Sequence, residues 1–131
     1  MQQGELQSIL VVEDEADIRK IIKVSLENVG GFEVEMCASA HEALEVLPNR
    51  NPDLILLDVM MPVMDGPTLL KEIKQNTNSK DIPVIFLTAK VQSHEVEEYM
   101  DMGVIGVISK PFDPVELPEK IKHLWQTMSP A

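Results

Sequence analysis

Polar side chains follow four of the five apolar runs in this sequence, and their types suit phosphoryl chemistry. Glu13 and Asp14 follow the first run, Asp58 the third, Thr88 the fourth and Lys110 the fifth. Neighbouring carboxylates repel one another, which a hard divalent cation such as Mg²⁺ relieves. A carboxylate beside such a cation can be the nucleophile that accepts a phosphoryl group, here Asp58. The Thr88 hydroxyl and the Lys110 ammonium can then bind phosphoryl oxygens and neutralise developing charge.

Each of these residues also has a structural explanation when it is taken alone. An acid after a strand is often a helix N-cap, and a threonine is common at the end of a strand. A single lysine is usually a solvated charge. These explanations do not account for polar groups at the ends of four apolar runs, so we interpret the five residues as one site.

The elements that would place these residues alternate along the chain. Apolar runs predict five strands, and apolar residues at helical spacing predict five helices. The predicted strands cover residues 8–12, 32–38, 53–57, 83–87 and 106–109; the predicted helices cover 17–29, 40–47, a segment from 69 that fades after 75, 95–102 and 113–128. On the first helix, Arg19 and its lysine neighbours are expected to face solvent. Five strand–helix units predict an α/β fold with a doubly wound parallel sheet, whose functional groups lie beyond the carboxyl ends of the strands.

The composition indicates one acidic globular domain. The chain has 131 residues, 44% of them hydrophobic, and a formal net charge of −11. That length fits a single domain, residues 1–131 with a core at about 8–126, and that charge disfavours direct contact with nucleic acid or an anionic membrane. No apolar run is long enough to span a membrane. The single cysteine, Cys37, excludes an internal disulfide and a cysteine metal cage, so we expect a reducing, cytoplasmic setting.

Four motifs occur in one order along the chain and carry a family resemblance. They are residues 10–15 (LVVEDE), 56–62 (LLDVMMP) with 65–66 (DG), 87–89 (LTA) and 109–112 (SKPF). With these motifs at the spacing of the family, the chain resembles the receiver domain of response regulators in two-component signalling. The resemblance extends over residues 8–126, which is nearly the whole chain.

The resemblance implies a fold, a phosphodonor and an output surface. The fold is the flavodoxin-like (βα)5 arrangement with strand order 2-1-3-4-5. Asp58 is the implied phosphoacceptor, and a sensor histidine kinase or a histidine phosphotransfer protein is the implied donor. Thr88 and Lys110 are implied to contact the phosphoryl group, and the Lys110–Pro111 peptide bond is expected to be cis. The implied output surface, for an unidentified protein partner, combines the fourth helix, the fifth strand and the fifth helix.

The resemblance also implies a Mg²⁺ site. Asp14, Asp58 and the backbone carbonyl of Met60 would bind the ion directly, whereas Glu13 would act mainly through a bound water. Met60 and Lys90 occupy positions that tune hydrolysis of the acyl phosphate in similar domains. Because the Met60 thioether cannot orient a water by hydrogen bonding, we predict a long-lived phosphoryl group.

Three positions depart from the family pattern. Val107 stands where the family often has an aromatic switch residue. This chain therefore has no aromatic side chain at that position that could change its orientation when Thr88 moves. Residues 104–106 lack the paired acids that many DNA-binding members use in dimers, so we expect a monomer or a weak dimer. Pro118 follows an apparent helix start at Asp113 and is expected to distort the first turn of the last helix.

The main hypothesis is a signalling switch with slow self-catalysed phosphoryl chemistry, not an enzyme. A phosphohydrolase that forms an aspartyl phosphate would need a general acid two residues after the nucleophile, where this chain has Met60. A nucleotide- or flavin-binding domain would need glycines in the loop of residues 13–16, which instead holds three acids. The remaining alternative is a pseudo-receiver that is not phosphorylated, and the full set of site residues argues against it. Whether the domain acts alone, in a phosphorelay or within a longer protein stays open.

Overall fold

The computed structural model describes residues 4–128 and contains one five-stranded sheet. Its strands are parallel and lie in the order β2-β1-β3-β4-β5, which confirms the expected flavodoxin-like topology. The strands are β1 (Ser8–Val12), β2 (Glu33–Cys37), β3 (Leu54–Asp58), β4 (Val84–Thr88) and β5 (Gly106–Ser109). The helices are α1 (Ala16–Val24), α2 (Ala40–Val46), α3 (Gly66–Gln75), α4 (Ser93–Asp101) and α5 (Leu117–Thr127), with a π-helical segment at Ser25–Val29 and a 3-10 turn at Leu47–Asn49.

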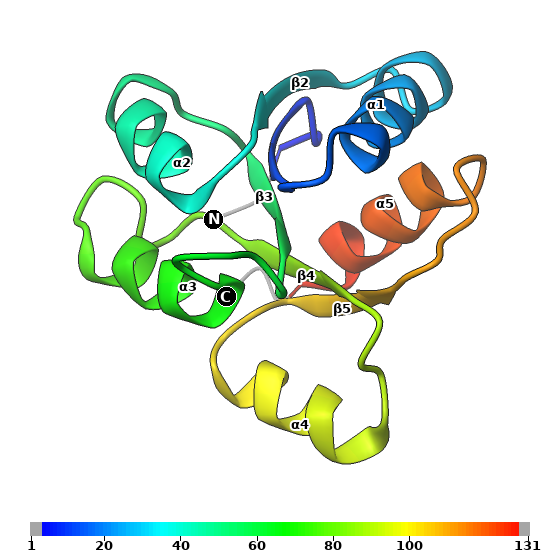
Figure 1. Cartoon of the computed structure of the whole chain (residues 1–131). Coiled ribbons are helices and arrows are strands. Elements are labelled where there is room, and N and C mark those ends of the chain that lie inside the picture. The colour runs from blue at the N-terminus through cyan, green and yellow to red at the C-terminus, as the bar shows by residue number, and fades with distance from the viewer. Residues whose placement is uncertain (1–3, 129–131) are drawn as a thin grey trace.

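Helices cover both faces of the sheet, with α1 and α5 on one face and α2, α3 and α4 on the other (Figure 1). Successive residues of a strand point to opposite faces, so β1 contributes to two cores. Ile9 packs with Ile22 and Ile121 in the first core. Leu10 packs with Leu70 in the second. No helix within residues 4–128 is long and apolar enough to cross a membrane.

The position of each strand in the sheet explains its sequence pattern. β3 and β4 are buried along their whole length, as strands covered on both faces must be, and their sequences are almost continuously apolar. β2 lies at the edge of the sheet and is exposed or half-buried except at Cys37. Because all five strands are parallel, their carboxyl ends meet at one edge of the sheet, where the predicted site residues stand.

The first helical segment reaches Val29 as predicted, although its last turn is π-helical. Gly30 follows, and its lack of a side chain is required by its surroundings. A Cβ atom at this position would lie 2.7 Å from the Leu26 carbonyl oxygen and 2.8 Å from the Phe32 ring. A larger residue would therefore push apart the helix end and the start of β2.

The last helix begins three residues later than the sequence predicted, with its N-cap at Glu116 instead of Asp113. The Asp113 carbonyl accepts from the Glu116 amide at 3.1 Å and from the Leu117 amide at 2.9 Å, and the Asp113 side chain accepts from the Val115 amide at 2.8 Å. The next helical bond cannot form, because Pro118 has no N–H to donate. The expected distortion by Pro118 thus takes the form of a turn at residues 114–116, after which the helix is regular.

Candidate functional site

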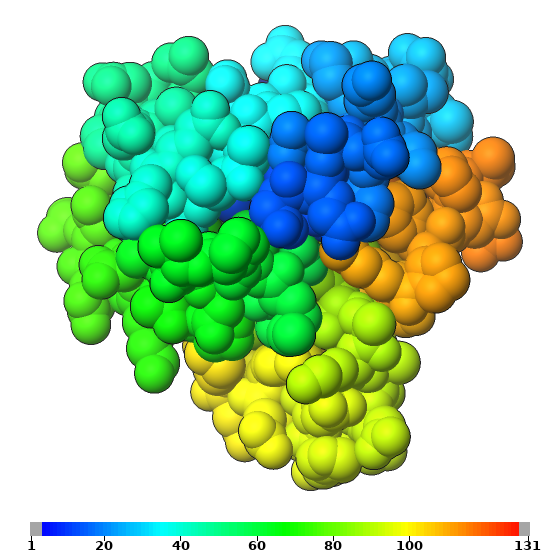
Figure 2. All heavy atoms as spheres, in the orientation of Figure 1, coloured from blue at the N-terminus to red at the C-terminus, as the bar shows by residue number. Residues whose placement is uncertain are grey.

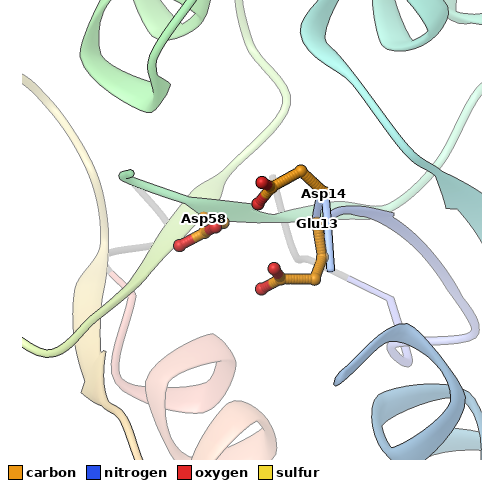
Figure 3. A group of neighbouring side chains, drawn as sticks. All are labelled: Glu13, Asp14 and Asp58. Carbon is orange, nitrogen blue, oxygen red and sulfur yellow. The ribbon is translucent and has the colours of Figure 1, made fainter. Parts of the chain in front are cut away.

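Three carboxylates gather at the carboxyl ends of β1 and β3 (Figure 3). Glu13 and Asp14 follow β1, and Asp58 is the last residue of β3. One oxygen atom from each carboxylate lies within 4.8 Å of the other two. The register of the sheet explains this proximity, since Val12 pairs with Leu57 and the next residues of both strands are acids.

The burial of these carboxylates makes the cluster suited to a cation. Glu13 is fully buried and Asp58 is 2% exposed. The Asp14 Oδ1 and Asp58 Oδ2 atoms are buried and have no hydrogen-bond partner among residues 4–128. A buried charged oxygen without a partner destabilises a fold unless a counter-charge is supplied. Hard carboxylate oxygens in this number fit a divalent cation such as Mg²⁺.

Lys110 supplies one positive charge to the cluster from the end of β5. Its Nζ atom lies 2.9 Å from Glu13 Oε1 and 3.1 Å from Asp58 Oδ1. Burial lowers the pKa of Lys110, but its contacts with Glu13 and Asp58 outweigh burial and raise the pKa above the ordinary value. Lys110 therefore stays protonated, and one cation faces three carboxylates. The Lys110–Pro111 peptide bond is cis, which confirms the prediction.

Asp58 is the carboxylate whose acidity the site changes most clearly. Burial is the largest cause, and the Glu13 carboxylate adds to it, so that the pKa of Asp58 rises to about 7 although Lys110 opposes the change. A carboxyl group with that pKa is about half protonated at neutral pH. Without a further cation, the cluster therefore does not hold its full negative charge at neutral pH.

Thr88 lies one strand away from the carboxylates, at the end of β4. Leu87 pairs with Asp58 in the sheet, so Thr88 stands one residue beyond the acid. Its side chain is buried, and its Oγ1 atom accepts a hydrogen bond from the Lys90 amide at 3.0 Å. Its carbonyl accepts from the Lys110 amide at 2.9 Å. The hydroxyl proton of Thr88 takes no part in either bond.

Met60 lies in the segment between β3 and α3, and the residue is 61% exposed. That the Met60 backbone carbonyl binds a metal ion stays a prediction. The same segment returns to β3 at Gly66, whose amide donates to the Val59 carbonyl at 2.9 Å. A Cβ atom at Gly66 would lie 2.6 Å from the Asp58 carbonyl oxygen, so glycine is required here. The sequence showed Gly66 in a motif, but the close approach to Asp58 needed the three-dimensional structure.

The prediction that Arg19 faces solvent is wrong. Its side chain is half-buried, and its Nη1 atom donates to the carbonyl oxygens of Glu13 at 2.9 Å and Asp14 at 2.8 Å. Side chains of a helix point toward its N-terminus, so a long residue in the first turn of α1 can reach back to the preceding loop. Helical periodicity alone does not indicate this contact.

The segments that follow β1, β3, β4 and β5 meet at the middle of one face of the molecule (Figure 2, blue, green, yellow-green and orange). The five predicted site residues lie at the carboxyl ends of these four strands or directly after them: Glu13, Asp14, Asp58, Thr88 and Lys110. The structure thus gathers the three carboxylates, places Lys110 in direct contact with Glu13 and Asp58, and has Thr88 on the adjoining strand.

Comparisons with known proteins agree on one family. Residues 9–122 match the family model of the response regulator receiver domain. The chain is 38% identical over 124 residues to the phosphate regulon transcriptional regulatory protein PhoB of Pseudomonas aeruginosa, covering 95% of this chain and 54% of that protein. It is 35% identical over 117 residues to the response regulator Rre1 of Synechocystis, covering 89% and 51%. The chain therefore spans about half the length of these curated relatives.

Solved structures show the same likeness over whole chains. The chemotaxis response regulator CheY4 of Vibrio cholerae has a TM-score of 0.84 with 30% sequence identity, covering 92% of this chain and 99% of that one. The N-terminal domain of a response regulator receiver protein from Methanoculleus marisnigri has a TM-score of 0.72 with 39% identity, covering 91% and 96%.

Proposed function

This chain belongs to the response-regulator receiver family of two-component signalling, and on that premise we propose that Asp58 is its phosphoacceptor. Phosphorylation on an aspartate is the general function of the family, whose members generally work as signalling switches. The observation that carries the assignment is the position of Asp58. It is buried at the end of a central strand, contacts Lys110 at 3.1 Å and shares the acidic cluster with Glu13 and Asp14.

The family is generally Mg²⁺-dependent, and the acidic cluster of this chain could bind such an ion. We propose that Asp14, Asp58 and the Met60 carbonyl hold Mg²⁺ directly and that Glu13 contacts it through water. The bound ion would supply positive charge against the phosphoryl oxygens and the carboxylates. The unpartnered oxygens of Asp14 and Asp58 support this assignment.

The remaining steps use side chains of this chain. An oxygen of Asp58 attacks the phosphorus of a phosphohistidine, so that a P–O bond forms while the P–N bond breaks and its electron pair returns to the imidazole. The Lys110 ammonium, 3.1 Å from Asp58 Oδ1, is placed to pair with a phosphoryl oxygen. Thr88 can donate its hydroxyl proton to another oxygen.

The partners follow from the same proposal. Membership in the receiver family implies interaction with histidine kinases or phosphotransfer proteins. We propose that the phosphorylated domain then acts by binding a further protein and makes no direct contact with nucleic acid or membrane, in keeping with its net charge of −11. A cytoplasmic location and a monomer or weak dimer complete the proposal.

Intact mass after incubation with acetyl phosphate and Mg²⁺ tests the phosphoacceptor. We expect one added phosphoryl group, which is lost in Asp58→Asn and in excess chelator. Asp81→Asn is the matched control, because Asp81 is exposed and lies before β4, away from the cluster. Phosphorylation that persists in Asp58→Asn would show that another residue is the acceptor. A wild-type chain that binds neither phosphoryl group nor Mg²⁺ would favour the pseudo-receiver instead.

A further inference from the structure

We propose that Arg19 is a positioning residue that holds Asp14 in its metal-binding orientation, an inference that rests on the proposed function of the acidic cluster. Within residues 4–128, the Arg19 side chain forms no hydrogen bond or ion pair with any of the three carboxylates. It binds the backbone instead, through one nitrogen atom shared between the carbonyls of Glu13 and Asp14.

The two carbonyls that accept from Arg19 belong to the two peptide groups on either side of the Asp14 Cα atom. The Glu13 carbonyl is part of the peptide that precedes this atom, and the Asp14 carbonyl is part of the peptide that follows it. A peptide group is planar, so hydrogen bonds to both groups from one nitrogen atom restrict the backbone dihedral angles of Asp14. Those angles determine the direction in which the Asp14 carboxylate leaves the backbone.

Asp14 depends on this backbone contact more than its neighbour does. The Glu13 side chain is bound by Lys110 at 2.9 Å and by the Glu15 amide at 3.1 Å. The Glu13 amide also donates to the Cys37 carbonyl of β2 at 3.0 Å. The Asp14 side chain, in contrast, forms no ion pair within residues 4–128, and its buried Oδ1 atom has no hydrogen-bond partner there. Its place near Asp58 is therefore set mainly by the loop backbone that Arg19 holds.

The positive charge of Arg19 and its carbonyl contacts have opposite effects on Mg²⁺ affinity. A cation close to a metal site repels the metal ion, so loss of the charge alone would strengthen Mg²⁺ binding. Loss of the two carbonyl contacts would instead free the Asp14 backbone and weaken Mg²⁺ binding, as loss of outer contacts of a metal site commonly does. The direction of the change in Mg²⁺ affinity thus separates positioning from simple charge.

Calorimetric titration with MgCl₂ tests the proposal on the full chain. We expect Arg19→Met to weaken Mg²⁺ binding by about 10-fold. Arg19→Lys keeps the charge and can still donate to a carbonyl, so its affinity should lie between those of wild type and Arg19→Met. Lys20→Met is the matched control, because Lys20 is an exposed cation of the same helix and forms no ion pair within residues 4–128. Its affinity should stay at the wild-type value or rise slightly.

Phosphorylation kinetics give a second readout that a merely structural role would not move. With acetyl phosphate as donor, the Mg²⁺ concentration at half-maximal rate should rise about 10-fold in Arg19→Met, while the rate at saturating Mg²⁺ stays near that of wild type. Unchanged or tighter Mg²⁺ binding in Arg19→Met would overturn the proposal, even if its thermal midpoint fell. Asp14→Asn distinguishes a failure of the proposed role of Arg19 from a failure of the proposed Mg²⁺ site. If Asp14→Asn leaves Mg²⁺ binding intact, Asp14 is not a metal ligand and the proposed Mg²⁺ assignment fails, whereas Asp58 as phosphoacceptor is tested separately by Asp58→Asn.

Discussion

Cys37, at the end of β2, illustrates how burial controls the reactivity of a single residue. The residue is fully buried, and burial, followed by the Glu42 and Glu35 carboxylates, raises the pKa of its thiol to about 12. Because only the thiolate is nucleophilic, about one thiol in ten thousand is reactive at pH 8. We expect iodoacetamide to label the native chain far more slowly than the same chain in denaturant at that pH. Labelling followed by intact mass checks this, and equal rates in both conditions would contradict the burial of Cys37.

Met60, two residues after Asp58, should control how long the phosphoryl group persists. Its exposed thioether cannot orient an attacking water by hydrogen bonding, so the side chain at this position does not promote hydrolysis. We expect Met60→Gln, which adds an amide at similar side-chain length, to shorten the half-life of the phosphorylated chain several-fold. Met60→Leu should leave the half-life unchanged. Decay measured by intact mass after removal of acetyl phosphate checks both, and a wild-type half-life of seconds would refute the predicted persistence.

Single residues also show where sequence reasoning succeeds. Glu13 and Asp58 were predictable as neighbours, because parallel strands end at one edge of the sheet. No single structural role explains polar residues at the ends of several such strands. Arg19 was not, because its contact depends on which way a long side chain folds back over a loop. Gly66 was visible as a glycine, but its 2.6 Å approach to the Asp58 carbonyl belongs to the path of a loop that no periodic pattern describes.

The start of α5 shows the same limit for a whole element. Residues 113–116 have the composition of a helix start, yet Pro118 removes the donor that the Pro114 carbonyl would need. The Ser25 hydroxyl takes that place and donates to the Pro114 carbonyl at 2.5 Å. Ser25 is 1% exposed and opens the π-helical segment after α1. A helix-capping rule applied along the chain cannot anticipate a bond between residues 89 positions apart.

A double-mutant cycle tests this link between the π-helical segment and the start of α5. We expect Ser25→Ala to lower the free energy of unfolding by about 1 kcal/mol, because it leaves the Pro114 carbonyl without a donor. Pro118→Ala restores a backbone N–H that can donate to the same carbonyl. In that background Ser25→Ala should therefore lower the free energy of unfolding by less. Urea denaturation of the four chains measures the difference, and equal losses in both backgrounds would show that the two donors do not share the Pro114 carbonyl.

At the scale of the whole molecule, the acidic cluster opposes folding when no divalent cation is present. A pKa raised to about 7 means that ionised Asp58 is less stable in the folded chain than in the unfolded chain. Among residues 4–128, Lys110 is the only cation that forms an ion pair with the cluster, and it contacts Glu13 and Asp58. The same burial that prepares the site for a cation therefore lowers the stability of the domain at neutral pH and above.

We expect Asp58→Asn to raise the free energy of unfolding in excess chelator at pH 8 by about 1 kcal/mol, because it removes one buried negative charge. Added Mg²⁺ should stabilise the wild-type chain through binding to its folded state and stabilise Asp58→Asn much less. Thermal unfolding at constant ionic strength measures both effects, and Asp81→Asn should behave as wild type because Asp81 is exposed. A loss of stability in Asp58→Asn without Mg²⁺ would mean that Lys110 already balances the cluster. The domain would then need no cation to offset the charges gathered at the carboxyl ends of β1 and β3.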